Sequence, residues 1–136
     1  MPAHNDSFPW MSYYGNYRFF EDRMGSHNKV SDVRNTGEGL YEIDLKDGRT
    51  LVAFICDCYS FGLAEYQESV ERLGKLNAVV INSNWCNYTM DLKLHCQEKE
   101  VGVFDIGSFM AALNQQKFWE YLSEEEKERL QQDQGI

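Results

Sequence analysis

The chain has few residues that break secondary structure and no long apolar segment. Its two prolines both lie before residue 10, so no proline interrupts a helix or strand over the rest of the 136 residues. No apolar run approaches the roughly 20 residues that a membrane-spanning helix needs. The first residues, Met1–Ser7, lack the basic and apolar regions of a signal peptide. We therefore expect a cytoplasmic protein with no membrane partner.

Basic residues are also scarce. Lysine and arginine number 13 against 22 aspartates and glutamates, which gives a formal net charge of -9. An acidic domain gains little from the neutralisation of phosphates that dominates affinity for nucleic acids. The charge therefore weighs against nucleic acid as a partner. It suits a protein partner or a homo-oligomer, or an acidity that serves solubility alone.

What is present is a globular composition that is rich in aromatic residues. The chain is 43% hydrophobic and 14% aromatic, and it is long enough to bury one core. We expect a single domain over residues 1–136. Its parts are an aromatic N-terminal segment at 8–34, a core at about 37–114, and a C-terminal helix within 116–133.

The core begins with the pattern of a β-hairpin and continues as alternating helices and strands. Residues 39–45 alternate apolar and polar, Asp47-Gly48 is a turn signal, and residues 50–59 form an almost continuous apolar strand. The elements expected next are a helix at 61–74, a strand at 77–82, a helix capped by Asn87 or Thr89, a strand at 101–106, a helix capped by Ser108, and a helix that opens with a capping box at Ser123. This order predicts an α/β fold with a mixed central sheet flanked by helices.

Three stretches of this pattern are similar to a known family. They are Ala78-Val-Val-Ile-Asn-Ser83, Tyr88-Thr89, and Gly102-Val-Phe-Asp-Ile106 followed by Ser108-Phe-Met-Ala-Ala-Leu113. Over rather more than half of its length the chain resembles the restriction-endonuclease-like, or PD-(D/E)xK, fold, especially the Mrr-like branch. The resemblance implies a restriction-endonuclease-like core, with the aromatic N-terminal segment and the C-terminal helix as additions. It also implies a hairpin that carries acidic residues.

The chemistry of that family requires carboxylates that hold Mg²⁺ and a lysine near the attacked phosphate. Glu42 or Asp44 matches the first acid, and Asp57 is the acidic residue available for the second. No lysine lies between Lys46 and Lys75, so the lysine of the motif is missing. We expect a degenerate active site, no bound metal and no cofactor.

Two alternatives remain open for these acids. The acids would still hold Mg²⁺ if Arg49 or Lys93 replaced the missing lysine, with Glu65 as an additional ligand, and the chain would then be a metal-dependent nuclease. Glu42 and Asp44 would otherwise be the solvated face of a half-exposed hairpin.

Two further regions are candidates for binding. In the aromatic segment, Tyr13, Tyr17 and Phe20 are spaced as one face of a helix that Gly25 would end. With Trp10 they form either a partner interface or a segment folded across the core. The second region is the polar loop after the strand at 77–82, which would bind a small ligand or a partner, or cap the next helix. Its candidate residues are Asn82, Asn84, Trp85 and Asn87.

The four cysteines fit core thiols better than a metal site. Cys56 and Cys58 are separated by a single residue, and His95-Cys96 offers no second pair with the spacing of a zinc site. Cys86 lies in a polar loop with no histidine beside it, which is weak support for a nucleophilic cysteine.

The hypothesis that follows is a non-catalytic domain that binds a protein or assembles with itself on a degenerate nuclease-like scaffold. Small domains of this kind are often carried by mobile elements or phages, which is an analogy at the level of the fold. The alternatives are the metal-dependent nuclease with Glu42, Asp44 and Asp57, and a small-ligand-binding domain that uses the loop at 82–87.

Overall fold

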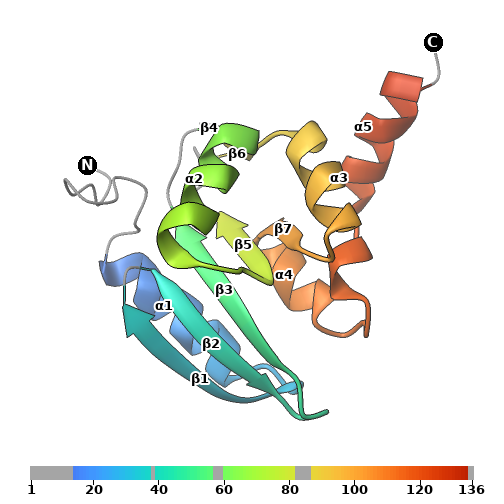
Figure 1. Ribbon diagram of the computed structural model, residues 1–136. Coiled ribbons are helices and arrows are strands. Elements are labelled where there is room, and N and C mark those ends of the chain that lie inside the picture. The colour runs from blue at the N-terminus through green and yellow to red at the C-terminus, as the bar shows by residue number, and fades with distance from the viewer. Residues whose placement is uncertain (1–13, 38, 57–59, 82–86, 135–136) are drawn as a thin grey trace.

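A computed structural model describes residues 14–37, 39–56, 60–81 and 87–134. In these residues the protein is an α/β fold whose main sheet has five strands in the order β1-β2-β3-β5-β7 (Figure 1). The bounds are β1 (Val30–Gly37), β2 (Leu40–Leu45), β3 (Thr50–Cys56), β5 (Ala78–Ile81) and β7 (Gly102–Asp105). Strands β1, β2 and β3 are antiparallel, and β3, β5 and β7 are parallel. The expected mixed sheet is confirmed.

The predicted hairpin forms because its turn residues fit its geometry. Gly48 has a φ of 97°, a backbone conformation that residues with a side chain rarely adopt. Its N–H donates to the carbonyl of Leu45 at 3.0 Å. The strands then pair with Leu40 opposite Phe54 and Glu42 opposite Val52. The alternation of residues 39–45 therefore places Tyr41, Ile43 and Leu45 in the core and leaves Glu42 and Asp44 on the other face.

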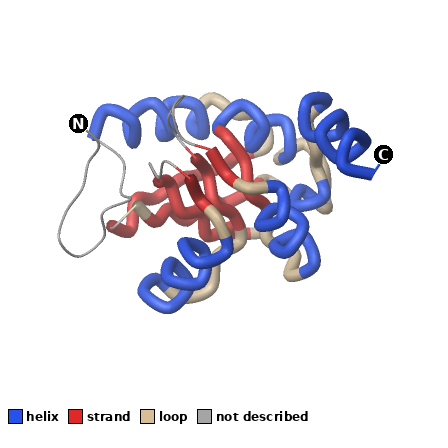
Figure 2. The backbone as a smooth tube through the Cα atoms, turned by 90° about the horizontal axis from the view of Figure 1, so that it is seen from above, coloured by secondary structure: helices blue, strands red, loops and turns tan. Residues whose placement is uncertain are grey.

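Helices cover both faces of the sheet (Figure 2). One core contains Phe20 and Met24 of α1 (Tyr14–Gly25) and Phe109 of α4 (Ile106–Ala112), packed on β2, β3 and β5. The other contains Tyr66 of α2 (Leu63–Leu73) and Leu92 of α3 (Met90–Glu98). Successive residues of β3 and β5 enter the two cores in turn, which is why their sequences are almost wholly apolar.

Shorter elements complete the chain. Strands β4 (Ser60–Phe61) and β6 (Asn87–Tyr88) pair in parallel beyond the ends of β3 and β5. The short helix η1 (Phe118–Glu120) and the last helix, α5 (Glu124–Gln134), follow α4. The predicted capping box begins α5: Ser123 N–H donates to Glu126 at 2.9 Å, and Glu126 N–H donates to Ser123 Oγ at 3.2 Å. No helix among the described residues is long and apolar enough to cross a membrane.

The structure corrects the predicted bounds in two places. The sheet begins at β1, although the sequence placed the start of the core near residue 37. Helix α4 begins at Ile106 and is capped by Asp105, which accepts from Ser108 N–H at 2.7 Å, so Ser108 is not the cap. Of the two candidate caps of α3, Thr89 is the cap, and it accepts from Leu92 N–H.

Candidate functional site

The acidic residues predicted on the hairpin lie side by side on β2, and Arg34 of β1 binds them. The two Arg34 Nη atoms lie 2.7 and 3.1 Å from the carboxylate oxygens of Asp44. The same guanidinium contacts Glu42 at 3.2 Å and Asp32 at 3.0 Å. Thr50 Oγ1 donates to Asp44 at 2.8 Å. One arginine thus offsets one of the three carboxylate charges and binds oxygens that a divalent cation would otherwise use.

This cluster changes the protonation chemistry of its members. Hydrogen bonds from Arg34 and then from Thr50 lower the pKa of Asp44 to about 2. Hydrogen bonds to Asp44, and then to Asp32 and Glu42, raise the pKa of Arg34 above its already high ordinary value. Asp44 and Arg34 therefore stay charged at neutral pH, and the Asp44 carboxylate is a poor proton acceptor.

Beyond Thr50, the described part of β3 places apolar side chains on the face of these acids. Val52 lies opposite Glu42, and Phe54 lies opposite Leu40. Phe54 and Cys56 are fully buried in the core under α2 and α3. The described β3 positions on this side of the sheet therefore carry apolar side chains, and neither a lysine nor a second acid is present at them. Asp57, the predicted second acid, lies outside the described residues.

The alternative residues proposed for a nuclease site do not meet the hairpin acids. Glu65 accepts from Gly62 N–H at 3.0 Å and so caps α2. Arg49 pairs with Asp47 at 2.8 Å and donates to the carbonyl of Gln116 at 2.7 Å. Among the described residues, no three histidine, cysteine, aspartate or glutamate side chains lie where they could hold a metal ion.

Lys93 is the least expected of these residues, because it is buried completely. Its Nζ lies 3.0 Å from Glu126 of α5 and 2.6 Å from the carbonyl of Val103. It also lies 4.3 Å from the centre of the Phe104 ring. The hydroxyl of Tyr88 donates to Glu126 at 2.5 Å. The group links α3, α5, β6 and β7 in one buried polar network.

Burial and pairing act in opposite directions on this network. Burial lowers the pKa of Lys93, and the charge of Glu126 offsets only part of that effect. For Glu126, burial alone would raise the pKa, but hydrogen bonds from Tyr88 and Ser123 and the charge of Lys93 lower it overall. Burial, followed by the contact with Glu126, raises the pKa of Tyr88. Glu126 is therefore ionised at neutral pH, and its charge favours the protonated form of Lys93 against the effect of burial.

The two other predicted binding regions are placed only in part. Trp10, Tyr13, Asn82, Asn84 and Trp85 lie outside the described residues. Asn87 opens β6 opposite Ser60. Tyr17 packs against the core under α1.

Phe20 is fully buried between Tyr41 and Phe109, with ring centres 5.1 and 6.2 Å away. Its prediction as an interface residue is wrong, because no surface of the ring remains for a partner. On the same helix Phe19 is 46% exposed, with the Arg23 guanidinium 4.8 Å from its ring centre.

The cysteines that the structure describes belong to the core. Cys56 and Cys96 are both buried in the cluster beneath α2 and α3. Burial raises the pKa of Cys96 to about 12, so its thiolate is strongly disfavoured. Cys58 and Cys86 lie outside the described residues.

Sequence reasoning missed Arg34 and Glu126. Arg34 comes from a polar edge strand whose pattern gave no sign of pairing with β2. Glu126 was recognised as part of a capping box, but its buried partner Lys93 lies 33 residues earlier in the chain.

In comparisons with known proteins, no family model, no curated protein and no solved structure matches this chain.

Proposed function

We propose that the chain is a non-catalytic domain that binds a protein or a second copy of itself on a restriction-endonuclease-like scaffold. The observation that carries the proposal is the position of Arg34 among Asp32, Glu42 and Asp44. An internal cation takes up carboxylate oxygens that a metal ion would need. The apolar residues Phe54 and Cys56 on the neighbouring strand support the same conclusion.

The scaffold part of the proposal rests on the order of the elements. An acidic hairpin, a helix that crosses to a parallel strand, a second helix and a short parallel strand follow one another here as the resemblance implies. The catalytic positions of the family would fall on β2 and β3, where this chain has an acid pair bound by Arg34 and, at Ile55 and Cys56, buried side chains that carry no charge.

A metal and cleavage assay tests the absence of catalysis. We expect Mg²⁺ and Mn²⁺ to leave the melting temperature unchanged, and we expect no cleavage of single- or double-stranded DNA. Glu42→Gln and Asp44→Asn serve as the matched variants. A metal-dependent rise in melting temperature that either variant abolishes would favour the nuclease alternative, and metal-dependent cleavage lost in the same variants would establish it.

Sedimentation velocity over a range of concentrations tests self-assembly through α1. Phe19 and Phe20 are neighbours with opposite environments, so they form a matched pair. We expect Phe19→Ala to reduce concentration-dependent association and to leave stability unchanged, and Phe20→Ala to reduce stability instead. Association that Phe19→Ala does not alter would remove α1 as the interface.

A further inference from the structure

Four of the seven lysines of this acidic chain precede strands that begin at the same edge of the sheet. Strands β1, β3, β5 and β7 all run in the same direction, because β2 is antiparallel to both β1 and β3. They therefore begin at the same edge, and a lysine precedes each of them. These are Lys29, Lys46, Lys75 and Lys99.

Their ammonium groups are not neutralised locally. Arg34, Lys93 and Arg129 all form ion pairs with carboxylates. In the part of the chain that the structure describes, none of the four lysines at the starting edge forms such a pair. The starting edge is thus a positive region on a chain whose net charge is -9.

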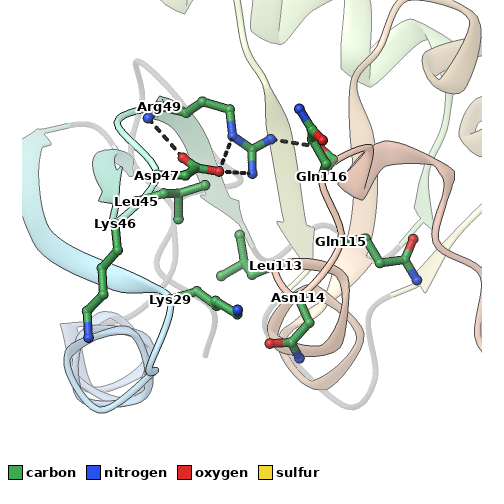
Figure 3. A pocket seen from close by; sticks show the side chains of 9 residues that line it. All are labelled: Lys29, Leu45, Lys46, Asp47, Arg49, Leu113, Asn114, Gln115 and Gln116. Carbon is green, nitrogen blue, oxygen red and sulfur yellow. Dashed lines mark hydrogen bonds and ion pairs between the residues drawn. The ribbon is translucent and has the colours of Figure 1, made fainter.

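A hollow of about 460 Å³ opens at this edge between the hairpin turn and the segment after α4 (Figure 3). A backbone hydrogen bond of 2.9 Å from Lys46 N to Lys29 O joins the two segments that carry these lysines, and their side chains point in different directions (Figure 3). Arg49 is fixed by Asp47 on one side and by the carbonyl of Gln116 on the other. The amide side chains of Asn114 and Gln115 add further hydrogen-bond donors to the lining.

A second hollow of about 310 Å³ adjoins the first and shares Arg49 with it. Lys75 and Lys99 contribute two more cations there, against a single carboxylate from Glu100. Trp119, partly buried against Phe118, supplies an apolar wall. The two hollows together have the size and the mixture of groups of a small-molecule site.

The chemistry of the lining selects among anions. Lysine ammonium groups act as point charges that bind phosphate, whereas arginine offers a planar fork that binds a carboxylate or a phosphate in two places. The fork of Arg49 is already engaged with Asp47 and Gln116. The overall negative charge opposes a long polyanion but not a short one that fits inside the hollows.

We propose that these adjoining hollows bind a small phosphorylated ligand. Lys29 and Lys46 bind the phosphate in the first hollow, and the rest of the ligand extends past Arg49 toward Trp119 in the second. This site does not depend on the scaffold being nuclease-like, so failure of the proposed function leaves it unaffected.

Isothermal titration with inorganic pyrophosphate tests the site. We expect the full-length protein to bind pyrophosphate, and we expect the double variant Lys29→Gln/Lys46→Gln to weaken binding roughly tenfold or more, since each lost charge-assisted contact is a large share of a weak affinity. Lys127→Gln is the matched control, because Lys127 is an exposed lysine on α5 that lines neither hollow. It should leave the affinity unchanged.

The outcomes separate the possible ligands. Citrate provides negative charge through carboxylates, and a single-stranded oligonucleotide provides a long polyanion. Weaker binding of both than of pyrophosphate supports the proposal. Four results would each overturn it. Citrate could bind as tightly as pyrophosphate, or the oligonucleotide could bind more tightly. Pyrophosphate could fail to bind at millimolar concentration, or the double variant could bind it with unchanged affinity. Lys29 and Lys46 are exposed, so circular dichroism should show a folded double variant.

Discussion

Removing the charge of Glu126 should destabilise the protein strongly, and by an amount that depends on pH. In Glu126→Gln the ammonium of Lys93 stays buried with the carbonyl of Val103 and two aromatic rings, but without its counter-charge. Breaking a buried ion pair from one side costs about 3–5 kcal/mol. Lysine can limit the cost by releasing its proton on folding.

Release of this proton sets the upper bound of the destabilisation and its dependence on pH. An unfolded lysine has a pKa of about 10.4, so keeping Lys93 neutral at pH 7 costs about 4.6 kcal/mol, and about 1.4 kcal/mol less for each unit that the pH rises. The unfolded state binds the extra proton, and stability therefore increases with pH in this window. The deficit of Glu126→Gln should shrink steadily between pH 7 and pH 10.

The reciprocal variant should show the opposite slope. Lys93→Met leaves Glu126 buried with hydrogen bonds from Tyr88 and Ser123, which lessen the loss. Its carboxyl pKa would rise in the folded state, so the folded state binds the extra proton and the deficit shrinks as the pH falls. In Lys93→Met/Glu126→Gln neither charge remains, and part of the loss should be recovered.

Urea denaturation of the four proteins under reducing conditions between pH 4 and pH 10 measures these effects, since the Glu126 carboxyl titrates in the acidic part of this range and Lys93 in the basic part. The reasoning would be refuted by a Glu126→Gln deficit of less than about 1 kcal/mol at pH 7, which is the range of an exposed pair. Parallel pH slopes for the two single variants would refute it as well. Strict additivity in the double variant would show that Lys93 and Glu126 do not interact in solution.

Three other predictions concern the hairpin and its turns. Arg34→Ala should let Ca²⁺ or Mn²⁺ raise the melting temperature, because Asp32, Glu42 and Asp44 would lose their shared cation; Arg72→Ala, on an exposed helix pair, should not. The Asp44 carboxyl should titrate near pH 2 by NMR, with its stabilising effect present above its ordinary range and lost as the pH falls through 2; in Arg34→Ala the midpoint should rise. Gly39→Ala should lower the free energy of unfolding, measured by urea denaturation, by roughly 1–3 kcal/mol. The loss should exceed that of Gly48→Ala, because both glycines have a positive φ but a Cβ at Gly39 would also lie 2.9 Å from the carbonyl oxygen of Ile55. Equal losses in the two variants would contradict this.

The parts of the fold that the sequence predicted are those with a strong local signal. The Asp47-Gly48 turn between an alternating strand and an apolar one defined the β2–β3 hairpin. Four consecutive apolar residues identified β5, which is buried on both faces. In these segments burial and local turn chemistry agree, so no knowledge of tertiary contacts was needed.

Strand β1 was missed because its residues carry no such signal. Val30 is its one buried residue, and Ser31, Asp32 and Arg34 show no alternation of apolar and polar residues. The strand forms because its backbone completes the edge of β2 and because Arg34 meets acids eight and ten residues later. Pairing of this kind depends on residues outside any local window. Phe20 was misassigned for a similar reason, since helical spacing identifies a face but not whether that face points to solvent or to the core.

The starting edge of the sheet was overlooked for a different reason. Ligand sites in α/β sheets usually lie beyond the carboxyl ends of the strands, so attention fell on Asp57 and on the loop at 82–87. The connections before the strands lie together at the opposite edge, but only once the direction of every strand is known. Lys29 belongs with Lys75 and Lys99 solely because β1 and β3 run the same way. The four lysines are far apart in the sequence, but the topology places the connections that carry them at one edge of the sheet, where they form a basic surface. Titration with pyrophosphate tests whether this surface binds a phosphorylated ligand.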